Sequence, residues 1–228
     1  MDLPREIPVM TLPNAILFPQ AMLPLYIFEP RYRKMLQDAL NSHRMFSVAM
    51  QRPGSNREIP LPVAGLGLIR VSVGNKDGTS HLILQGIARV ELEETVRYKP
   101  YRVQKIRPLE TTGADSVAVD ALTQKVLELV AERLELGVRF PLHILKQFGK
   151  LTDTETSELG VSSLKRLIKN LVSIPNPDHL ADFVSCTLLP NAEERQIILQ
   201  TVHLETRLKH LVHFLLAENK RCRESNNS

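Results

Sequence analysis

A lysine and a serine stand close together in the stretch Lys76-Asp77-Gly78-Thr79-Ser80. A serine hydroxyl becomes a nucleophile when a nearby base takes its proton, and a lysine can be that base. The flanking residues favour another interpretation, because Asn75, Asp77 and Gly78 tolerate positive φ and lie between two alternating apolar runs. The stretch therefore predicts the turn of a β-hairpin, and we expect no catalytic residue in it.

The other residue types that bind metals or activate substrates are poorly spaced for that purpose. His210 and His213 are neighbours at i, i+3 on a predicted helix that also carries His203, but no HExxH or matching carboxylate accompanies them. Cys186 and Cys222 are far from CxxC spacing. The phosphate-binding pattern GxxxxGK(S/T) does not occur. We therefore expect no metal, no cofactor and no ATPase activity.

Charge suggests an alternative function, the binding of RNA. The chain has 29 basic and 25 acidic residues, a formal net charge of +4, and 5% aromatic residues without tryptophan. Basic residues recur along the predicted strands at Arg70, Arg89, Arg97, Lys99, Arg102, Lys105 and Arg107. Glu91, Glu93 and Glu94 lie among them and would partly cancel their field. A solvated sheet face is the simpler interpretation, and RNA binding remains the alternative.

Composition favours a globular protein. Of 228 residues, 43% are hydrophobic, and no stretch approaches the length needed to span a bilayer. The first residues, MDLPREIPVM, lack the pattern of a signal peptide. With only two cysteines, these features predict a soluble protein of the reducing cytoplasm that does not bind membranes.

The elements that must position any site begin with a proline-rich stretch, Leu12 to Tyr32. Pro13, Pro19 and Pro24 exclude a continuous helix and favour turns or strands between them. Leu25 to Phe28 reads as a short strand. Pro30 then fits the first position of a helix to Asn41, with its apolar face at Tyr32, Met35, Leu36, Ala39 and Leu40.

Short strands with glycine corners follow the predicted helix. Met45 to Met50 is a predicted strand, Ile69, Val71 and Val73 alternate with Arg70 and Ser72, and Gly86 is predicted to mark a bulge. A last strand is predicted around Tyr101 to Ile106. This pattern indicates a small barrel or curled sheet.

Helical periodicity begins after a polar linker at Thr111 to Asp115. Asp115 or Ser116 can cap a helix through Val130 that Gly137 ends, and Pro141 to Phe148 and Leu164 to Leu171 suggest two more. A further apolar face follows Pro177. The strongest helix signal is the capping pair Asn191 and Glu194, followed by apolar residues at steps of four and three, from Ile197 to Leu215. We predict one long helix from Ala192 to Asn219.

Two stretches carry a resemblance to a known family. The first contains Phe18-Pro19, Pro24-Leu25, Ile27-Phe28-Glu29, Arg31-Tyr32 and Met35. The second contains Leu180-Ala181-Asp182, Glu194, Gln196, Leu199, Arg207-Leu208 and Glu218. In this order they resemble the N-terminal substrate-binding domain of Lon proteases, in a stand-alone form without the ATPase and protease domains.

The resemblance implies an α+β fold: a β-rich, PUA-like pseudobarrel with one covering helix, followed by a C-terminal helical bundle that ends in a long helix. We expect a β-rich domain at 1–110, a helical domain at 116–220 and a flexible polar tail at 221–228. It also implies a non-catalytic module that binds unfolded or extended polypeptide and works with a separate ATP-dependent protease. We expect a monomer rather than a dimer.

The apolar residues of the first stretch are the candidate contacts. Strand alternation cannot turn all of them toward one small core, so those left over can line an exposed apolar surface. Methionine and aromatic side chains adapt to varied partners. The candidate peptide-binding residues are Phe18, Met22, Leu23, Tyr26 and Phe28.

Overall fold

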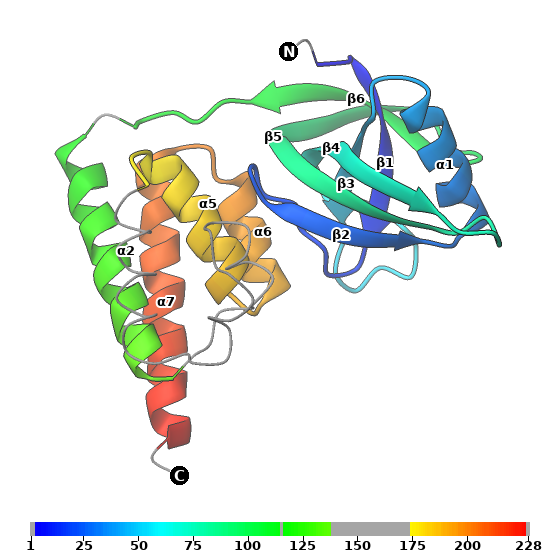
Figure 1. Cartoon of the computed structure of the whole chain (residues 1–228). Coiled ribbons are helices and arrows are strands. Elements are labelled where there is room, and N and C mark those ends of the chain that lie inside the picture. The colour runs from blue at the N-terminus through cyan, green and yellow to red at the C-terminus, as the bar shows by residue number, and fades with distance from the viewer. Residues whose placement is uncertain (1–2, 115, 138–173, 227–228) are drawn as a thin grey trace. The chain divides into compact units, whose positions relative to one another are not determined.

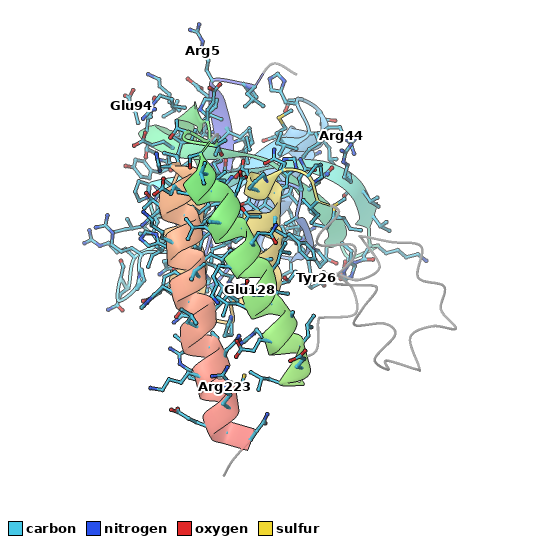
Figure 2. All side chains as sticks on the ribbon, turned by 90° about the vertical axis from the view of Figure 1, so that its left-hand side faces the viewer. Arg5, Tyr26, Arg44, Glu94, Glu128 and Arg223 are labelled. Carbon is cyan, nitrogen blue, oxygen red and sulfur yellow. The ribbon has the colours of Figure 1, made fainter. Side chains whose placement is uncertain are left out.

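The computed structural model describes residues 3–114, 116–137 and 174–226 (Figure 1), and Figure 2 adds their side chains. The chain divides into two compact units, Met1–Glu110 and Thr111–Ser228. The helices predicted at Pro141 to Phe148 and Leu164 to Leu171 lie outside the described residues.

The first unit is a mixed sheet that closes into a pseudobarrel, as predicted. Its strands are β1 (Glu6–Leu12), β2 (Met22–Ile27), β3 (Met45–Met50), β4 (Val63–Gly74), β5 (Ser80–Arg97) and β6 (Arg102–Leu109). Their order is β2-β5-β4-β3-β1-β6, and β5 also pairs with β6. The sheet closes because β5 is long enough to pair with β2 along its first half and with β6 along its second. Among these six strands, β1 and β3 are the one pair that runs parallel.

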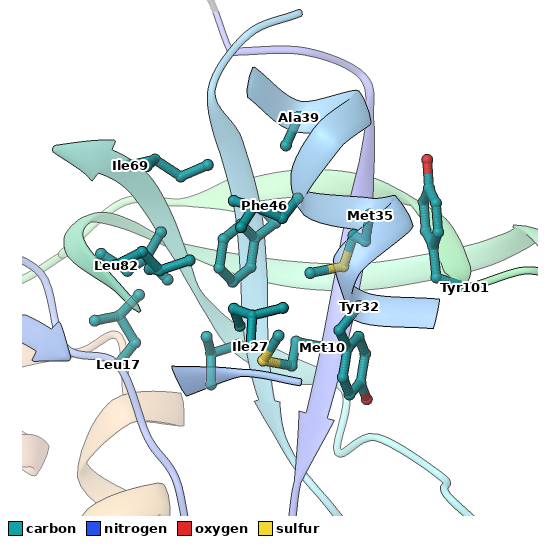
Figure 3. Close-up of a cluster of buried hydrophobic side chains, with 13 residues drawn as sticks. Met10, Leu17, Ile27, Tyr32, Met35, Ala39, Phe46, Ile69, Leu82 and Tyr101 are labelled. Atoms are coloured by element: carbon teal, nitrogen blue, oxygen red, sulfur yellow. The ribbon is translucent and has the colours of Figure 1, made fainter. Parts of the chain in front are cut away.

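Helix α1 (Pro30–Leu40) covers one side of this sheet. Pro30 occupies its first turn, where no N–H is needed, as the sequence predicts. Its buried residues Tyr32, Met35 and Ala39 pack around Phe46 of β3 in the cluster drawn in Figure 3. The predicted apolar face of this helix is confirmed.

One predicted alternation is wrong. Ile69 is 2% exposed, whereas Val71 and Val73 are 49% and 57% exposed, so the three do not share a face. The cause is a β-bulge: Ile69 pairs with Leu84 and Val71 with the adjacent Ile83, which leaves Arg70 as an extra residue. An inserted residue turns all later side chains of the strand over.

The second unit is helical in its described part. It contains α2 (Val117–Glu135), α5 (Pro177–Leu188), α6 (Ala192–Gln200) and α7 (Leu204–Asn226). The Ser116 hydroxyl accepts a hydrogen bond from the Val119 N–H at 3.1 Å, and the Asn191 side chain caps α6 in the same way. In α7, Leu208, Leu211 and Leu215 are fully buried.

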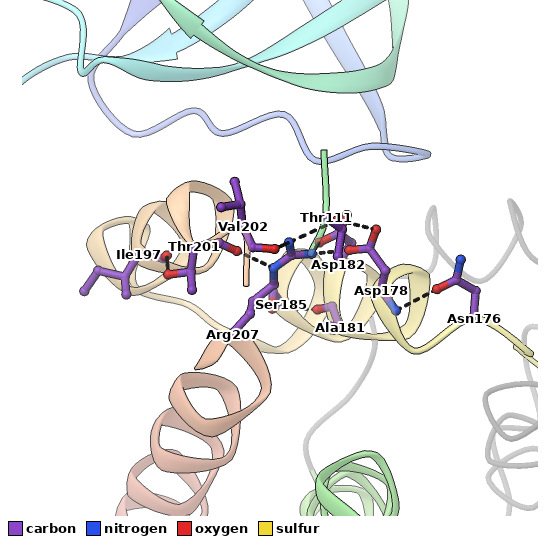
Figure 4. Close-up of polar contacts among 10 residues, drawn as sticks. All are labelled: Thr111, Asn176, Asp178, Ala181, Asp182, Ser185, Ile197, Thr201, Val202 and Arg207. Carbon is purple, nitrogen blue, oxygen red and sulfur yellow. Dashed lines mark hydrogen bonds and ion pairs between the residues drawn. The ribbon is translucent and has the colours of Figure 1, made fainter. Parts of the chain in front are cut away.

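The prediction of one continuous helix from Ala192 to Asn219 is also wrong, because the chain leaves the helical path between Gln200 and Leu204. Arg207, which is 0% exposed, holds this break open (Figure 4). Its guanidinium donates to the Thr201 carbonyl at 2.6 Å and the Val202 carbonyl at 3.2 Å. Those carbonyls are therefore turned away from the bonds of a regular helix. At its other end α7 continues to Asn226, through most of the stretch predicted as a tail.

Candidate functional site

The segment that leads into β2 packs its backbone against Gly65 and Gly86. A Cβ atom at Gly65 would lie 1.9 Å from the Leu17 carbonyl oxygen, and one at Gly86 would lie 1.9 Å from the Phe18 carbonyl oxygen. The Gln20 N–H donates to the Gly86 carbonyl at 2.9 Å, and the Gly86 N–H donates to the Ala21 carbonyl at 2.8 Å. Close contact through glycine thus fixes where β2 begins.

Side chains of β2 alternate between the core and the surface. Leu23 and Leu25 are half-buried and pack against the core cluster, and Ile27 is 2% exposed. Pro24 and Tyr26, on the other face of the strand, are exposed. Half-buried Met22 shares that outer face because strand residues two apart point the same way.

The outer side chains of β2 join those of β5 and β4 in one exposed group. Tyr26 pairs across the sheet with His81 and His81 with Val73, while Pro24 pairs with Ile83 and Ile83 with Val71. Together with Phe28 we call these residues the apolar face: Pro24, Tyr26, Phe28, Val71, Val73, His81 and Ile83.

Aromatic rings organise one end of the apolar face. The Tyr26 ring, labelled in Figure 2, stacks on His81 with 4.7 Å between centroids and on Phe28 with 5.8 Å. Tyr26 is 49% and Phe28 57% exposed. Contiguous large apolar side chains on a surface are typical of interaction sites.

The turn after Phe28 is held by a polar cluster. Arg31 pairs with Glu29 at 2.8 Å and also with Glu58, and the Tyr32 hydroxyl donates to Glu58 at 2.6 Å. Burial, together with this hydrogen bond to Glu58, raises the pKa of the Tyr32 phenol well above its ordinary value. These contacts tie the first turn of α1, directly after Phe28, to Glu58.

The structure separates the five predicted contact residues. Tyr26 and Phe28 meet on the apolar face and Met22 lies on the same side of β2, whereas Leu23 points toward the core. Phe18 is 1% exposed and belongs to the interior. Sequence reasoning missed Val71, Val73, His81 and Ile83, because their exposure depends on the bulge at Arg70 and on the register of three strands.

The stretch Lys76 to Ser80, considered above for catalysis, forms the turn of a β-hairpin. The Asn75 N–H donates to the Thr79 carbonyl at 2.8 Å, and Gly78 has a φ of +82°, so the predicted turn is confirmed. The Thr79 hydroxyl and N–H both donate to the Asp77 carboxylate, which lowers the pKa of that carboxyl. Ser80 pairs in the sheet with Ile27 and Gly74.

The histidines and cysteines have separate surroundings. His210 and His213 both contact the Phe214 ring, and burial raises the pKa of the Cys186 thiol to about 11. Within residues 3–114, 116–137 and 174–226, no group of three or more histidine, cysteine, aspartate or glutamate residues is arranged to hold a metal ion. Across the same residues, no helix is both long enough and apolar enough to cross a membrane.

Most of the basic strand residues lie beside acidic or aromatic partners. Arg107 pairs with Glu91 and Glu93, and Lys105 pairs with Glu94 at 2.7 Å. Arg89 is 4% exposed. The guanidiniums of Arg97 and Arg102 lie over the rings of Tyr101 and Tyr98. The carboxylate partners of Lys105 and Arg107 weaken the positive field that a nucleic-acid surface needs.

Comparison with known proteins identifies relatives along nearly the whole chain. A Lon protease of Dictyoglomus thermophilum is 23% identical over 220 residues, which cover 95% of this chain and 25% of that protein. Lon protease 2 of Myxococcus xanthus is 27% identical over 221 residues, which cover 94% of this chain and 24% of that protein. The chain thus spans about a quarter of the length of these relatives.

Solved structures share the fold. A Lon N-terminal domain protein from Xanthomonas campestris superposes with a TM-score of 0.61 at 18% identity, over 92% of this chain and 98% of that one. The N-terminal domain of a Mycobacterium avium complex Lon protease gives 0.62 at 17% identity, over 92% and 97%. Residues 6–217 match the family described as the ATP-dependent protease La (LON) substrate-binding domain. The chain therefore belongs to this family of substrate-binding domains.

Proposed function

We propose that this chain binds unfolded or extended polypeptide through the apolar face and does not itself catalyse a reaction. The observation that carries the proposal is the stacked, half-exposed pair Tyr26 and Phe28, continuous with Val71, Val73 and Ile83. Burying apolar surface against a partner is favourable and does not require a fixed sequence in that partner. Such a surface suits a module that presents diverse proteins to a separate ATP-dependent protease.

The membership of the family supports this proposal, because its description names substrate binding. The paired basic residues speak against the alternative, an RNA-binding surface on the strands. The two functions can also be distinguished by the salt dependence of binding. The affinity of apolar binding changes little with ionic strength. The affinity for RNA falls steeply as salt rises, because binding releases counterions from the phosphates.

The test uses fluorescently labelled α-lactalbumin that is reduced and carboxymethylated, so that it stays unfolded. Replacing both aromatic residues, Tyr26→Ser with Phe28→Ser, should weaken its binding by about tenfold or more, since buried aromatic residues dominate interface energies. Val117→Ser is the control, because Val117 is an apolar, 86% exposed residue outside the apolar face. It should bind like the unmodified chain.

Two results would contradict the proposal. One is unchanged affinity in the double variant. The other is binding of single-stranded RNA that falls by about a hundredfold between roughly 50 and 200 mM salt, which would favour the alternative function.

A further inference from the structure

Among the described strands, β2 is the one whose whole length pairs with a neighbour on a single side. Its partner is the first half of β5. The opposite edge of β2 carries main-chain N–H and C=O groups, and an open edge of this kind is a template for another extended chain.

The hydrogen-bond register shows which residues face that open edge. In an antiparallel pair, residues that exchange hydrogen bonds alternate with residues that do not. The Gly86 N–H donates to the Ala21 carbonyl, so the bonded positions continue at Leu23, Leu25 and Ile27. The main chains of Met22, Pro24 and Tyr26 therefore point away from β5.

Pro24 supports this assignment independently. Proline has no N–H, so it fits a position that gives no bond to the neighbouring strand. The open edge then offers donors at Met22 and Tyr26 but none at Pro24, while all three residues offer carbonyl oxygens. Proline at such an edge limits pairing between copies of the same protein.

The side chains along the open edge are apolar on both faces of β2. Met22, Pro24 and Tyr26 lie on the outer face, and Leu23 and Leu25, on the inner face, are only half-buried. An added strand would set its own side chains beside both rows. The alternating partial charges of the edge, positive at N–H and negative at C=O, are complemented by another peptide backbone in extended form.

The geometry points to strand addition: an extended polypeptide segment pairs its backbone with the free edge of β2 and lays alternate side chains against the apolar face. This inference rests on the proposed function and specifies its mode. Recognition of the backbone makes affinity depend on extended conformation more than on sequence, which is what a binder of diverse unfolded chains needs.

Hydrogen exchange of the free edge gives the first test. The probe is a peptide of alternating valine and threonine, flanked by lysines and about ten residues long, enough to cover β2 at roughly 3.3 Å per residue. Saturating the full chain with it should slow exchange of the Met22 and Tyr26 amides by about tenfold or more, as expected for amides newly bonded in a ladder. The Leu23 and Leu25 amides, already bonded to β5, are the internal controls and should not change.

Removing the proline gives the second test. Pairing with the edge and contact with the apolar face alone predict opposite changes in peptide affinity. Pro24→Ala adds a third donor to the edge and should strengthen peptide binding by about two- to tenfold, the worth of one hydrogen bond. If the peptide only lies on the apolar face, the same change removes apolar surface and weakens binding. Pro108→Ala, at an exposed position of β6 opposite Val90, is the control and should leave affinity unchanged.

The third test removes the main-chain N–H donor of Met22. Met22→Pro should weaken binding by about tenfold while Met22→Leu does not, because the main-chain N–H matters rather than the side chain. Peptide binding with unchanged exchange at Met22 and Tyr26 would overturn strand addition and leave the proposed function standing. No peptide binding at all would overturn both. Protection of the same amides in the free chain that grows with protein concentration would assign the edge to a second copy instead.

Discussion

At the scale of single residues, Arg207 is a fully buried charge held by several partners. Beyond the Thr201 and Val202 carbonyls, it pairs with Asp178, lies 3.7 Å from Asp182 and donates to the Thr111 hydroxyl at 3.2 Å (Figure 4). A buried charge survives only when it is paired and hydrogen-bonded. Asp182 and Arg207 are also residues that carry the family resemblance, and both are buried. Their shared role is structural.

Arg207→Met should therefore destabilise the helical unit by about 3 to 5 kcal/mol, because it removes the buried guanidinium that pairs with Asp178 and Asp182. Urea unfolding followed by helical circular dichroism measures this loss. Lys209→Met is the control, since Lys209 pairs with Glu205 at the surface and its loss should leave the unfolding midpoint in place. Equal midpoints for the two variants would show that the Arg207 contacts contribute nothing net.

At the scale of elements, the position of β2 depends on Gly65 and Gly86, which contact the segment that leads into it. The Leu17–Phe18 backbone lies where side chains at Gly65 and Gly86 would be. Gln20 and Ala21, directly before β2, are hydrogen-bonded to Gly86 itself. The prolines around this segment restrict its conformation, and the glycines determine where it rests.

Gly86→Ala should accordingly cost about 1 to 3 kcal/mol, the usual penalty of overpacking, and should weaken polypeptide binding by shifting β2. Thermal unfolding and the fluorescence titration report the two effects. Gly74→Ala is the matched control in the same sheet, because a Cβ there meets nothing nearer than the Ser80 hydroxyl at 4.0 Å. If both variants behave alike, the close contact at Gly86 does not position the strand.

At the scale of the whole molecule, the question is whether the apolar residues of α7 close an internal bundle or join two copies. Leu208, Leu211 and Leu215 are fully buried within one chain, and α7 lies beside α2 (Figure 1). Burial inside one chain favours the monomer that the sequence pattern predicts. A dimer seam would need the same residues to face a partner.

Leu208→Ala should cost about 2 to 5 kcal/mol, since it removes a fully buried side chain. The melting temperature of the unmodified chain should not depend on protein concentration, because an internal seam gives no mass-action term. Leu216, 48% exposed on the same helix, provides the control as Leu216→Ala, which should melt close to the unmodified chain. A melting temperature that rises with concentration would indicate a dimer.

Local signals in the sequence determined much of this architecture. Pro30 and the spacing from Tyr32 to Ala39 define α1, the Asn75 to Gly78 stretch defines a hairpin turn, and the caps Ser116 and Asn191 start α2 and α6. Each of these features depends on neighbours a few residues away. The family resemblance implied a β-rich half followed by a helical half. The match over residues 6–217 confirmed the family, and the element order confirmed the two halves.

Long-range contacts decided the rest. The burial of Phe18 depends on Gly65 and Gly86, more than forty residues away in the chain, and the exposure of Val71 depends on one bulged residue, Arg70. The break between α6 and α7 exists because Arg207 draws on the Thr201 and Val202 carbonyls, although the apolar spacing there suits a continuous helix. Periodicity predicts which apolar side chains share one face of an element. The register of the strands and the partners of buried charges decide which of them remain exposed.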